Sequence, residues 1–292
     1  MLLENKNVII TGSGRGIGKA VAIACAKEGA NIGITSRTLE ELETTKKEIK
    51  STNPNVKVIL KTADITNYEE VEELFKYFNE ELGVLHGVIA NAGASGRYDT
   101  HKFRPETFKV ILDVNVLGVF HTFKAAYPYI NKENKKDPGR FIITGSAAYP
   151  AAMPKFAAYT ATKYAVVGFQ KALSMEYKRE NIIFNIIAPT MVDTQLLRGD
   201  KAGDGNAPPG VMEPEELPKY YIFLLTKDAY RVKDEVIFTN EFEQVVSIIQ
   251  DAPEEKRRDW ETFKTYLEET NSKVYEDVRK TRRLVQFLLD RV

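Results

Sequence analysis

A tyrosine and a lysine one helical turn apart form a pair that could move a proton at neutral pH. Tyr159 and Lys163 stand in the stretch FAAYTATKYAV. A free phenol has a pKa near ~10, and a lysine on the same helix face would stabilise tyrosinate and lower that pKa. Such a phenol can give its proton to a carbonyl oxygen and take it back, as reversible carbonyl reduction requires.

The spacing alone does not decide, because Tyr98 and Lys102 in YDTHK repeat it. Ser146 follows the apolar run RFIIT, where its hydroxyl could hold a substrate oxygen in line with Tyr159. The pair at Tyr98 stands in a segment that we expect to be a loop. We therefore predict that Tyr159 and Lys163 are catalytic. The structural alternatives are that Ser146 caps the next segment and that Tyr159 is a core residue.

A glycine-rich stretch near the start of the chain could hold a phosphate. TGSGRGIGKAV, residues 11–21, directly follows an apolar run. Its four glycines allow a sharp turn, and a helix from about Ile17 would point free N–H groups and its positive dipole end at an anion. Ordinary turns also collect glycines, but the order of strand, glycines and helix at the start of a β-α-β pattern favours nucleotide binding.

Short apolar runs alternate with longer segments of helical period along most of the chain. The expected strands are NVIIT from Asn7, NIGITS from Asn31, VKVIL from Val56, HGVIA from His86, RFIIT from Arg140, IIFNIIA from Ile182 and the later EVIF. The segments between them carry apolar residues three and four apart. This alternation predicts an α/β fold: a doubly wound parallel sheet with helices on both faces and a ligand crevice beyond the carboxyl ends of the strands.

The motifs together resemble the classical short-chain dehydrogenase/reductase family, from about Asn5 to Phe238. The glycines follow the spacing Thr-Gly-x-x-x-Gly-x-Gly, and Ser146 precedes Tyr159 by thirteen residues. Further signposts are ADI at 63–65, NAG at 91–93 and Asn115 in LDVNVLG. The resemblance implies a Rossmann fold and a catalytic set of Asn115, Ser146, Tyr159 and Lys163. In this family, Asn115 would sustain a water link behind Lys163, which would also bond the nicotinamide ribose.

The resemblance also implies a set of cofactor contacts. They are Gly12, Ser13, Gly14, Arg15, Gly16, Ile17, Gly18, Ser36, Arg37, Asp64, Ile65, Asn91, Ala92, Gly93, Tyr159, Lys163, Pro189, Thr190, Val192 and Thr194. Among these, Asp64 and Ile65 would contact adenine, and Thr194 would bond the carboxamide. The sequence departs from the family at Thr190, where a glycine often follows the proline.

The end of the second expected strand bears on the choice of cofactor. A protein that selects NAD would be expected to carry an acidic side chain there. This chain has Ser36, followed by Arg37, and adds Arg15 in the glycine loop. Two guanidinium groups suit the 2′-phosphate of NADP, so we expect NADP(H) rather than NAD(H). The alternative is that both arginines are solvated surface charges.

Length and composition suggest one catalytic domain with an extension. We expect a dinucleotide-binding domain over 1–240, with a flap at about 190–214 rich in Gly, Pro and charge, and a helical extension over 241–292. The extension draws apolar stripes of Val274, Val278, Val285, Leu288 and Val292, and of Trp260, Phe263 and Leu267. Such stripes need a cover, either the catalytic core or a partner subunit.

Several classes of protein are disfavoured. Lysine plus arginine equals aspartate plus glutamate, 41 each, so we expect no nucleic-acid or membrane partner. The histidines lack metal-ligand spacing, so we expect no metal. A single cysteine and the absence of a signal-peptide pattern favour a cytoplasmic protein.

We expect an NADP(H)-dependent oxidoreductase that reversibly reduces a ketone or 3-oxoacyl-like carbonyl, working as a homodimer or homotetramer. A sugar, polyol or hydroxysteroid dehydrogenase is the enzymatic alternative. A non-catalytic NADP-binding sensor or assembly protein is the alternative from another class.

Overall fold

The computed structural model describes residues 1–291, and the contacts divide them into two compact units. The first unit is Met1–Ile237, and the second begins at Phe238. The sequence placed this boundary a few residues later, after 240.

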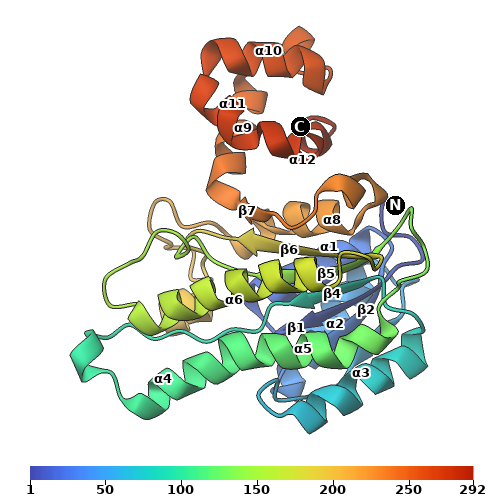
Figure 1. Ribbon diagram of the computed structural model, residues 1–292, viewed down its shortest axis with the longest axis vertical. Helices are drawn as coiled ribbons and strands as arrows, with labels where there is room; N and C mark the ends of the chain where they lie inside the picture. Colours follow the sequence, from blue (N-terminus) through green and yellow to red (C-terminus); the bar gives the residue numbers. More distant parts are fainter. Residues whose placement is uncertain (292) are drawn as a thin grey trace. The chain divides into compact units, whose positions relative to one another are not determined.

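The first unit is built on a seven-stranded sheet in the order β3-β2-β1-β4-β5-β6-β7 (Figure 1). The strands are β1 (Asn7–Thr11), β2 (Asn31–Thr35), β3 (Val58–Leu60), β4 (Gly87–Ala90), β5 (Gly139–Thr144), β6 (Ile182–Ala188) and β7 (Val236–Phe238). The ladders from β3 to β6 are all parallel. The order reverses between β1 and β4, which makes the crevice at their carboxyl ends the expected ligand site.

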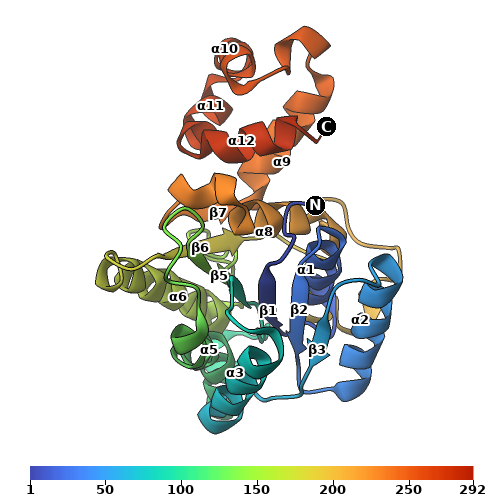
Figure 2. The same cartoon turned by 90° about the vertical axis from the view of Figure 1, so that its right-hand side faces the viewer.

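Helices cover both faces of the sheet. They are α1 (Gly16–Lys27), α2 (Leu39–Thr52), α3 (Tyr68–Leu82), α4 (Pro105–Leu112), α5 (Gly118–Ala126), α6 (Ala157–Glu176) and α8 (Pro218–Leu225). Figure 2 shows α1 and α2 on one side and α3, α5 and α6 on the other. Every residue of β1, β4, β5 and β6 is buried, as two covered faces require. The predicted doubly wound α/β fold is confirmed.

The long helical segment 105–129 is interrupted in a place that the sequence did not predict. Between α4 and α5, residues Asp113–Leu117 form a π-helical turn. By length and composition alone, 105–129 is the one described segment apolar enough to cross a membrane, yet half of its most apolar window is buried in the protein. Helix α4 contacts α6 and α5 contacts α3, so the buried half of this segment belongs to the core.

As far as residue 291, the second unit contains four α-helices, α9 (Thr239–Asp251), α10 (Trp260–Thr270), α11 (Ser272–Val278) and α12 (Arg282–Leu289). Helices α9 and α10 each contact both α11 and α12. Their stripes, including Phe263, Leu267, Val278 and Val285, are buried. The helices of this unit therefore cover one another, a possibility that the sequence analysis did not weigh. Val292, the last member of one stripe, lies outside the described residues.

Candidate active site

The predicted site residues follow the carboxyl ends of neighbouring strands. Residues 12–18 come after β1, 36–37 after β2, 64–65 after β3, 91–93 after β4, Ser146 after β5 and 189–194 after β6. Tyr159 and Lys163 lie on α6, and Asn115 lies in the π-helical turn. Because the strands are parallel, these segments share one edge of the sheet.

The glycine loop has the shape of an anion cradle. Gly12 adopts φ +65°, and a Cβ at this position would lie 2.8 Å from Ala92 Cα. A Cβ on Gly18 would collide with the Gly12 carbonyl and the Asn91 side chain. The N-terminus of α1, a helix that the structure describes in full, has no side-chain cap and no acidic residue in its first turn. Its amides and positive dipole end are therefore free for an anion, which fits a pyrophosphate.

One hydroxyl side chain and one amide side chain fix the glycine loop to the sheet. The Ser13 hydroxyl donates to the Ile10 carbonyl at 3.0 Å and accepts from the Thr35 amide at 2.9 Å. Ser13 is fully buried, so this structure gives its hydroxyl a structural role. The Asn91 side chain donates to the carbonyls of Thr11 and Gly12 at 3.0 and 3.1 Å. The loop is thus anchored to three strands.

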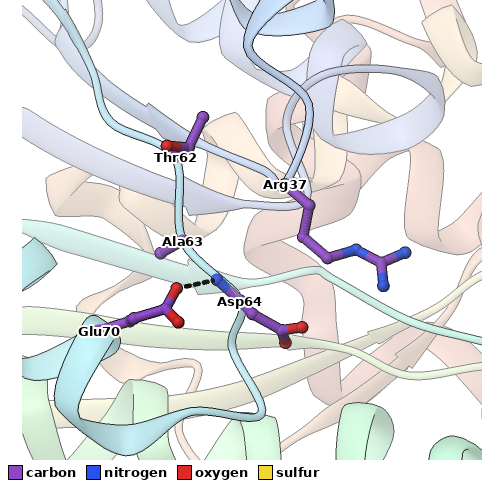
Figure 3. A pocket seen from close by; sticks show the side chains of 5 residues that line it. All are labelled: Arg37, Thr62, Ala63, Asp64 and Glu70. Carbon is purple, nitrogen blue, oxygen red and sulfur yellow. Dashed lines mark hydrogen bonds between the residues drawn. The ribbon is translucent and has the colours of Figure 1, made fainter.

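The opposite end of the crevice, beyond β2 and β3, contains a small pocket of about 230 Å³. It is lined by Arg37, Thr62, Ala63, Asp64 and Glu70 (Figure 3). The Asp64 amide donates to the Glu70 carboxylate at 2.9 Å. Burial opposes ionisation of Asp64, but hydrogen bonds from Thr66 and the charge of Arg37 hold its pKa below the usual value. Ile65, also predicted to contact adenine, follows Asp64 in the chain and is buried.

Ser36 and Arg15, two of the three residues that bear on the choice of cofactor, already have partners. The hydroxyl of the half-buried Ser36 hydrogen-bonds the backbone of Thr38. Arg15 donates to the Glu41 carboxylate at 2.9 Å, forming an ion pair across the glycine loop and α2. The sequence analysis missed Glu41, whose place in the first turn of the helix after Arg37 was its only signal.

The phenol and the ammonium on α6 lie next to each other. Lys163 Nζ lies 5.2 Å from the centre of the Tyr159 ring and donates to the Thr144 carbonyl at 3.0 Å. The Ser146 hydroxyl lies close enough to the Tyr159 phenol to lower its pKa, and it accepts from the Ala148 amide at 3.1 Å. The structure therefore gathers the serine, tyrosine and lysine at the end of β5.

The pKa of Tyr159 differs from the expectation. Burial raises the pKa of Tyr159, and the hydrogen bond from Ser146 only partly offsets this rise. Burial also lowers the pKa of Lys163 to about 8. The ammonium points at the Thr144 carbonyl and lies over the phenol ring, so desolvation prevails over the expected stabilisation of tyrosinate.

Asn115 connects α6 with the loop after β4. Its amide donates to the Ala94 carbonyl at 2.8 Å and to Thr162 Oγ1 at 3.0 Å. Thr162 in turn donates to the Tyr159 carbonyl at 2.7 Å. These hydrogen bonds, from Asn115 to Thr162 and from Thr162 to Tyr159, position the helix turn that carries the phenol.

The competing pair, Tyr98 and Lys102, is not arranged for catalysis. The Tyr98 side chain is 52% exposed, and Lys102 Nζ pairs with Asp99 at 3.4 Å. Lys102 ends a short 3₁₀ turn, Thr100–Lys102, that does not include Tyr98. The two side chains therefore do not share a helix face.

The flap is tied down by its own contacts. Val192 and Met212 form a parallel bridge, and the buried Asp193 pairs with Arg198 at 2.7 Å. Arg198 ends the short helix α7 (Gln195–Arg198). Thr194 Cγ2 lies 3.1 Å from the position of a Cβ on Gly16, so the flap reaches the glycine loop. Pro189 accepts from the Ala147 amide at 2.8 Å, next to Ser146.

Thr190 uses its side chain where the family often has glycine. Its hydroxyl donates to Met212 Sδ at 3.5 Å. The departure from the family pattern therefore links the start of the flap to its end.

One apolar side chain, Phe156, lies near Tyr159, and Tyr149 and Met153 stand between Ser146 and Phe156 in the chain. The Phe156 ring lies 6.4 Å from the Tyr159 ring, and Tyr149 packs edge-on against Tyr164. Met153 is 38% exposed. Among residues 1–291, no group of three or more His, Cys, Asp and Glu side chains is arranged to hold a metal ion.

Comparison with known proteins agrees with this arrangement. The profile described as short chain dehydrogenase matches residues 6–204. The 3alpha-hydroxysteroid dehydrogenase of Mediterraneibacter gnavus is 29% identical over 81% of this chain and 96% of that enzyme. The D-beta-hydroxybutyrate dehydrogenase of Cupriavidus necator is 30% identical over 68% of this chain and 74% of that enzyme.

A solved structure is similar over the same region. The alcohol dehydrogenase from the archaeon Thermococcus sibiricus, complexed with 5-hydroxy-NADP, has 30% identity and a TM-score of 0.71. The match covers 80% of this chain and 95% of that one.

Proposed function

Because this chain belongs to the short chain dehydrogenase family, we propose that it is an NADP(H)-dependent oxidoreductase that interconverts a ketone and a secondary alcohol. The observation that carries the proposal is the contact among Ser146, Tyr159 and Lys163 beside a cradle fit for a pyrophosphate. Bound in that cradle, a nicotinamide cofactor supplies or accepts a hydride.

The cofactor would lie along the carboxyl edge of the sheet. The amides of the glycine loop would hold its pyrophosphate, and residues 91–93 and 189–194 would flank its nicotinamide half. Arg37 and Arg15 favour NADP(H) because their charges attract a 2′-phosphate. The solved relative that carries 5-hydroxy-NADP is consistent with this preference.

The chain's own residues would handle the proton. The Ser146 hydroxyl would hold the substrate oxygen beside Tyr159, and the phenol would donate its proton as that oxygen gains charge. Because burial raises its pKa, the phenol stays protonated at neutral pH and serves as the acid in the reducing direction. Lys163 would fix the ribose hydroxyls through its ammonium, which the Thr144 carbonyl already orients.

The substrate that we favour first is a moderately apolar ketone or 3-oxoacyl group. Phe156 presents an apolar ring near the phenol, and Met153, three residues earlier in the chain, is exposed. The hydroxysteroid alternative is favoured by one observation, the similarity to a 3alpha-hydroxysteroid dehydrogenase over most of both chains. A 3-oxosteroid therefore belongs in the first substrate panel.

The deciding experiment is turnover with NADPH and a panel of a 3-oxoacyl thioester, cyclic and aromatic ketones, a 3-oxosteroid and a sugar. We expect NADPH oxidation with at least one carbonyl. Replacing Tyr159 with Phe should lower kcat by about 10²- to 10⁴-fold, whereas Tyr98→Phe should leave most of it. Tight NADPH binding without turnover of any substrate would instead favour the sensor alternative.

We also propose that the catalytic unit forms a homodimer through α4, α5 and α6. Large apolar side chains are exposed along these neighbouring helices: Val110, Leu117, Phe120, Tyr164 and Met175. In the dimer, these side chains would pack against the same surface of a second copy of the chain. Sedimentation of the wild type and of Phe120→Glu tests this, and a wild-type monomer would contradict it.

A further inference from the structure

We propose that Glu41 determines how strongly this protein distinguishes NADP from NAD, by occupying the guanidinium of Arg15. The inference rests on the proposed cofactor class. It goes beyond that class because it assigns selectivity to an acidic residue on α2 rather than to the end of β2.

Glu41 lies against the glycine loop. One carboxylate oxygen accepts from Arg15 Nη1 at 2.9 Å. The other lies 2.7 Å from the position that a Cβ on Gly14 would take, and Ser36 Oγ lies 3.0 Å from the same point. The carboxylate therefore stands where the glycine loop meets the residue that follows β2, between the two segments expected to frame the adenosine ribose.

The two candidate phosphate ligands are consequently not equivalent. Arg37 forms no ion pair with any side chain that the structure describes, and it lines the 230 Å³ pocket (Figure 3). Arg15 is already paired with Glu41. A 2′-phosphate that engaged Arg15 would have to displace or share this carboxylate, and it would meet a like charge at close range.

Other carboxylates add to the negative charge around this end of the crevice. Asp64 and Glu70 line the pocket beside Arg37. Together with Glu41, these carboxylates offset part of the attraction that Arg15 and Arg37 exert on a 2′-phosphate. We therefore expect the wild-type preference for NADP over NAD to be small.

The test measures binding rather than turnover. Dissociation constants for NADP⁺, NAD⁺, 2′,5′-ADP and 5′-AMP are determined by calorimetry at low ionic strength. Glu41→Gln removes the charge with little change in shape. Glu40→Gln is the matched control. Glu40 is an exposed acid in the same first turn of α2, so replacing it removes the same interaction with the helix dipole.

We expect Glu41→Gln to lower the dissociation constants of NADP⁺ and 2′,5′-ADP by about three- to tenfold. Those of NAD⁺ and 5′-AMP should change by less than about twofold. Glu40→Gln should leave the ratio of the two affinities as in the wild type. Adding Arg15→Gln to Glu41→Gln should abolish the gain. The gain should also shrink as salt is added, because these side chains are partly exposed.

Two results would overturn the inference. One is an unchanged ratio in Glu41→Gln, and the other is a selective loss of NAD⁺ affinity, which would mean that Glu41 binds the ribose hydroxyls instead. If neither dinucleotide binds the wild type or any variant, the proposed function itself is wrong. The two failures are therefore distinguishable.

Discussion

Asn115 and Ala94 exchange two hydrogen bonds, from the Ala94 amide to Asn115 Oδ1 at 2.7 Å and from Asn115 Nδ2 to the Ala94 carbonyl at 2.8 Å. The side chain is 1% exposed and lies in the π-helical turn between α4 and α5. A turn of this kind often stands at a functional site, where it directs one side chain out of the regular helix register. Here that side chain joins the loop after β4 to the helix that carries Tyr159.

Replacing Asn115 with Ala should lower stability and activity together. The Ala94 amide and carbonyl would lose their partners while partly buried, which costs about 1–3 kcal/mol of unfolding free energy. We also expect kcat to fall by roughly tenfold or more, since the support of the Tyr159 turn is lost. Urea unfolding and steady-state kinetics measure the two effects. Thr162→Val, which removes only one Asn115 contact, should have a smaller effect on both.

Lys163 predicts a pH dependence of stability with a defined sign. Its pKa is about 8 in the folded protein, below the value of 10.5 expected when unfolded. Below pH 8 both states carry the proton and the full cost of burying the ammonium is present. As pH rises from about 8 to 10.5, the unfolded state binds more protons, so this residue raises the unfolding free energy by roughly 3 kcal/mol.

The measurement compares wild type with Lys163→Met by chemical unfolding at a series of pH values. Other titrating groups cancel in the difference between the two proteins. The wild type should gain stability relative to the variant between about pH 8 and 10.5. A difference that stays constant over this range, or that changes in the opposite direction, would refute the assignment.

A buried ion pair at the amino-terminal edge of the sheet, just before β1 and β5, should contribute strongly to the stability differences among another set of variants. Lys6 Nζ pairs with the Asp137 carboxylate at 2.6 Å, and both side chains are 9% exposed. Asp137→Asn would leave the Lys6 ammonium buried without its counter-charge, at a cost of about 3–5 kcal/mol. Glu48→Gln, which breaks the exposed pair with Lys19, should cost at most about 1 kcal/mol.

Replacing both partners separates the attraction between the two charges from the cost of burying them. Lys6→Met combined with Asp137→Leu should recover most of the stability lost in Asp137→Asn, because no charge is then buried. Thermal melting and urea midpoints report this. A double variant as unstable as the single one would show that the pair contributes net stability.

Two truncations should behave differently. A chain that ends at Asp251 keeps α9 but loses α11 and α12, which pack against it, and exposes Phe242, Val245 and Ile249. A chain that ends at Phe238 keeps β7 and lacks all of the second unit except its first residue. We expect the chain that ends at Asp251 to aggregate or melt lower, while the chain that ends at Phe238 keeps cofactor binding. Sedimentation, melting and NADP⁺ titration of both proteins provide the check, and identical behaviour would contradict the division.

The strands and their ligand edge could be read from the sequence because the signals are local. The run NVIIT coincides with β1, and IIFNIIA coincides with β6. Apolar runs between glycines fix strand positions, and their alternation with helices requires a parallel sheet. The helical extension was also predicted, although not that its stripes cover one another.

The interrupted helix could not be predicted in the same way. All of 105–129 has helical period, and the π-helical turn is specified by contacts of Asn115 with residues that are distant in the chain. The pairing of Arg15 with Glu41 likewise joins residues from two different elements. Sequence spacing gives no distance between such elements.

The sequence by itself determined the fold class, since this depends on local periodicity, and it singled out Ser146, Tyr159 and Lys163 as the catalytic candidates. Only the tertiary structure decided the direction of the Tyr159 pKa, the acceptor of the Lys163 ammonium and the partner of Arg15. The reason is physical: desolvation and charge pairing depend on which groups lie within a few ångströms in space, and folding sets those distances between residues far apart in the chain.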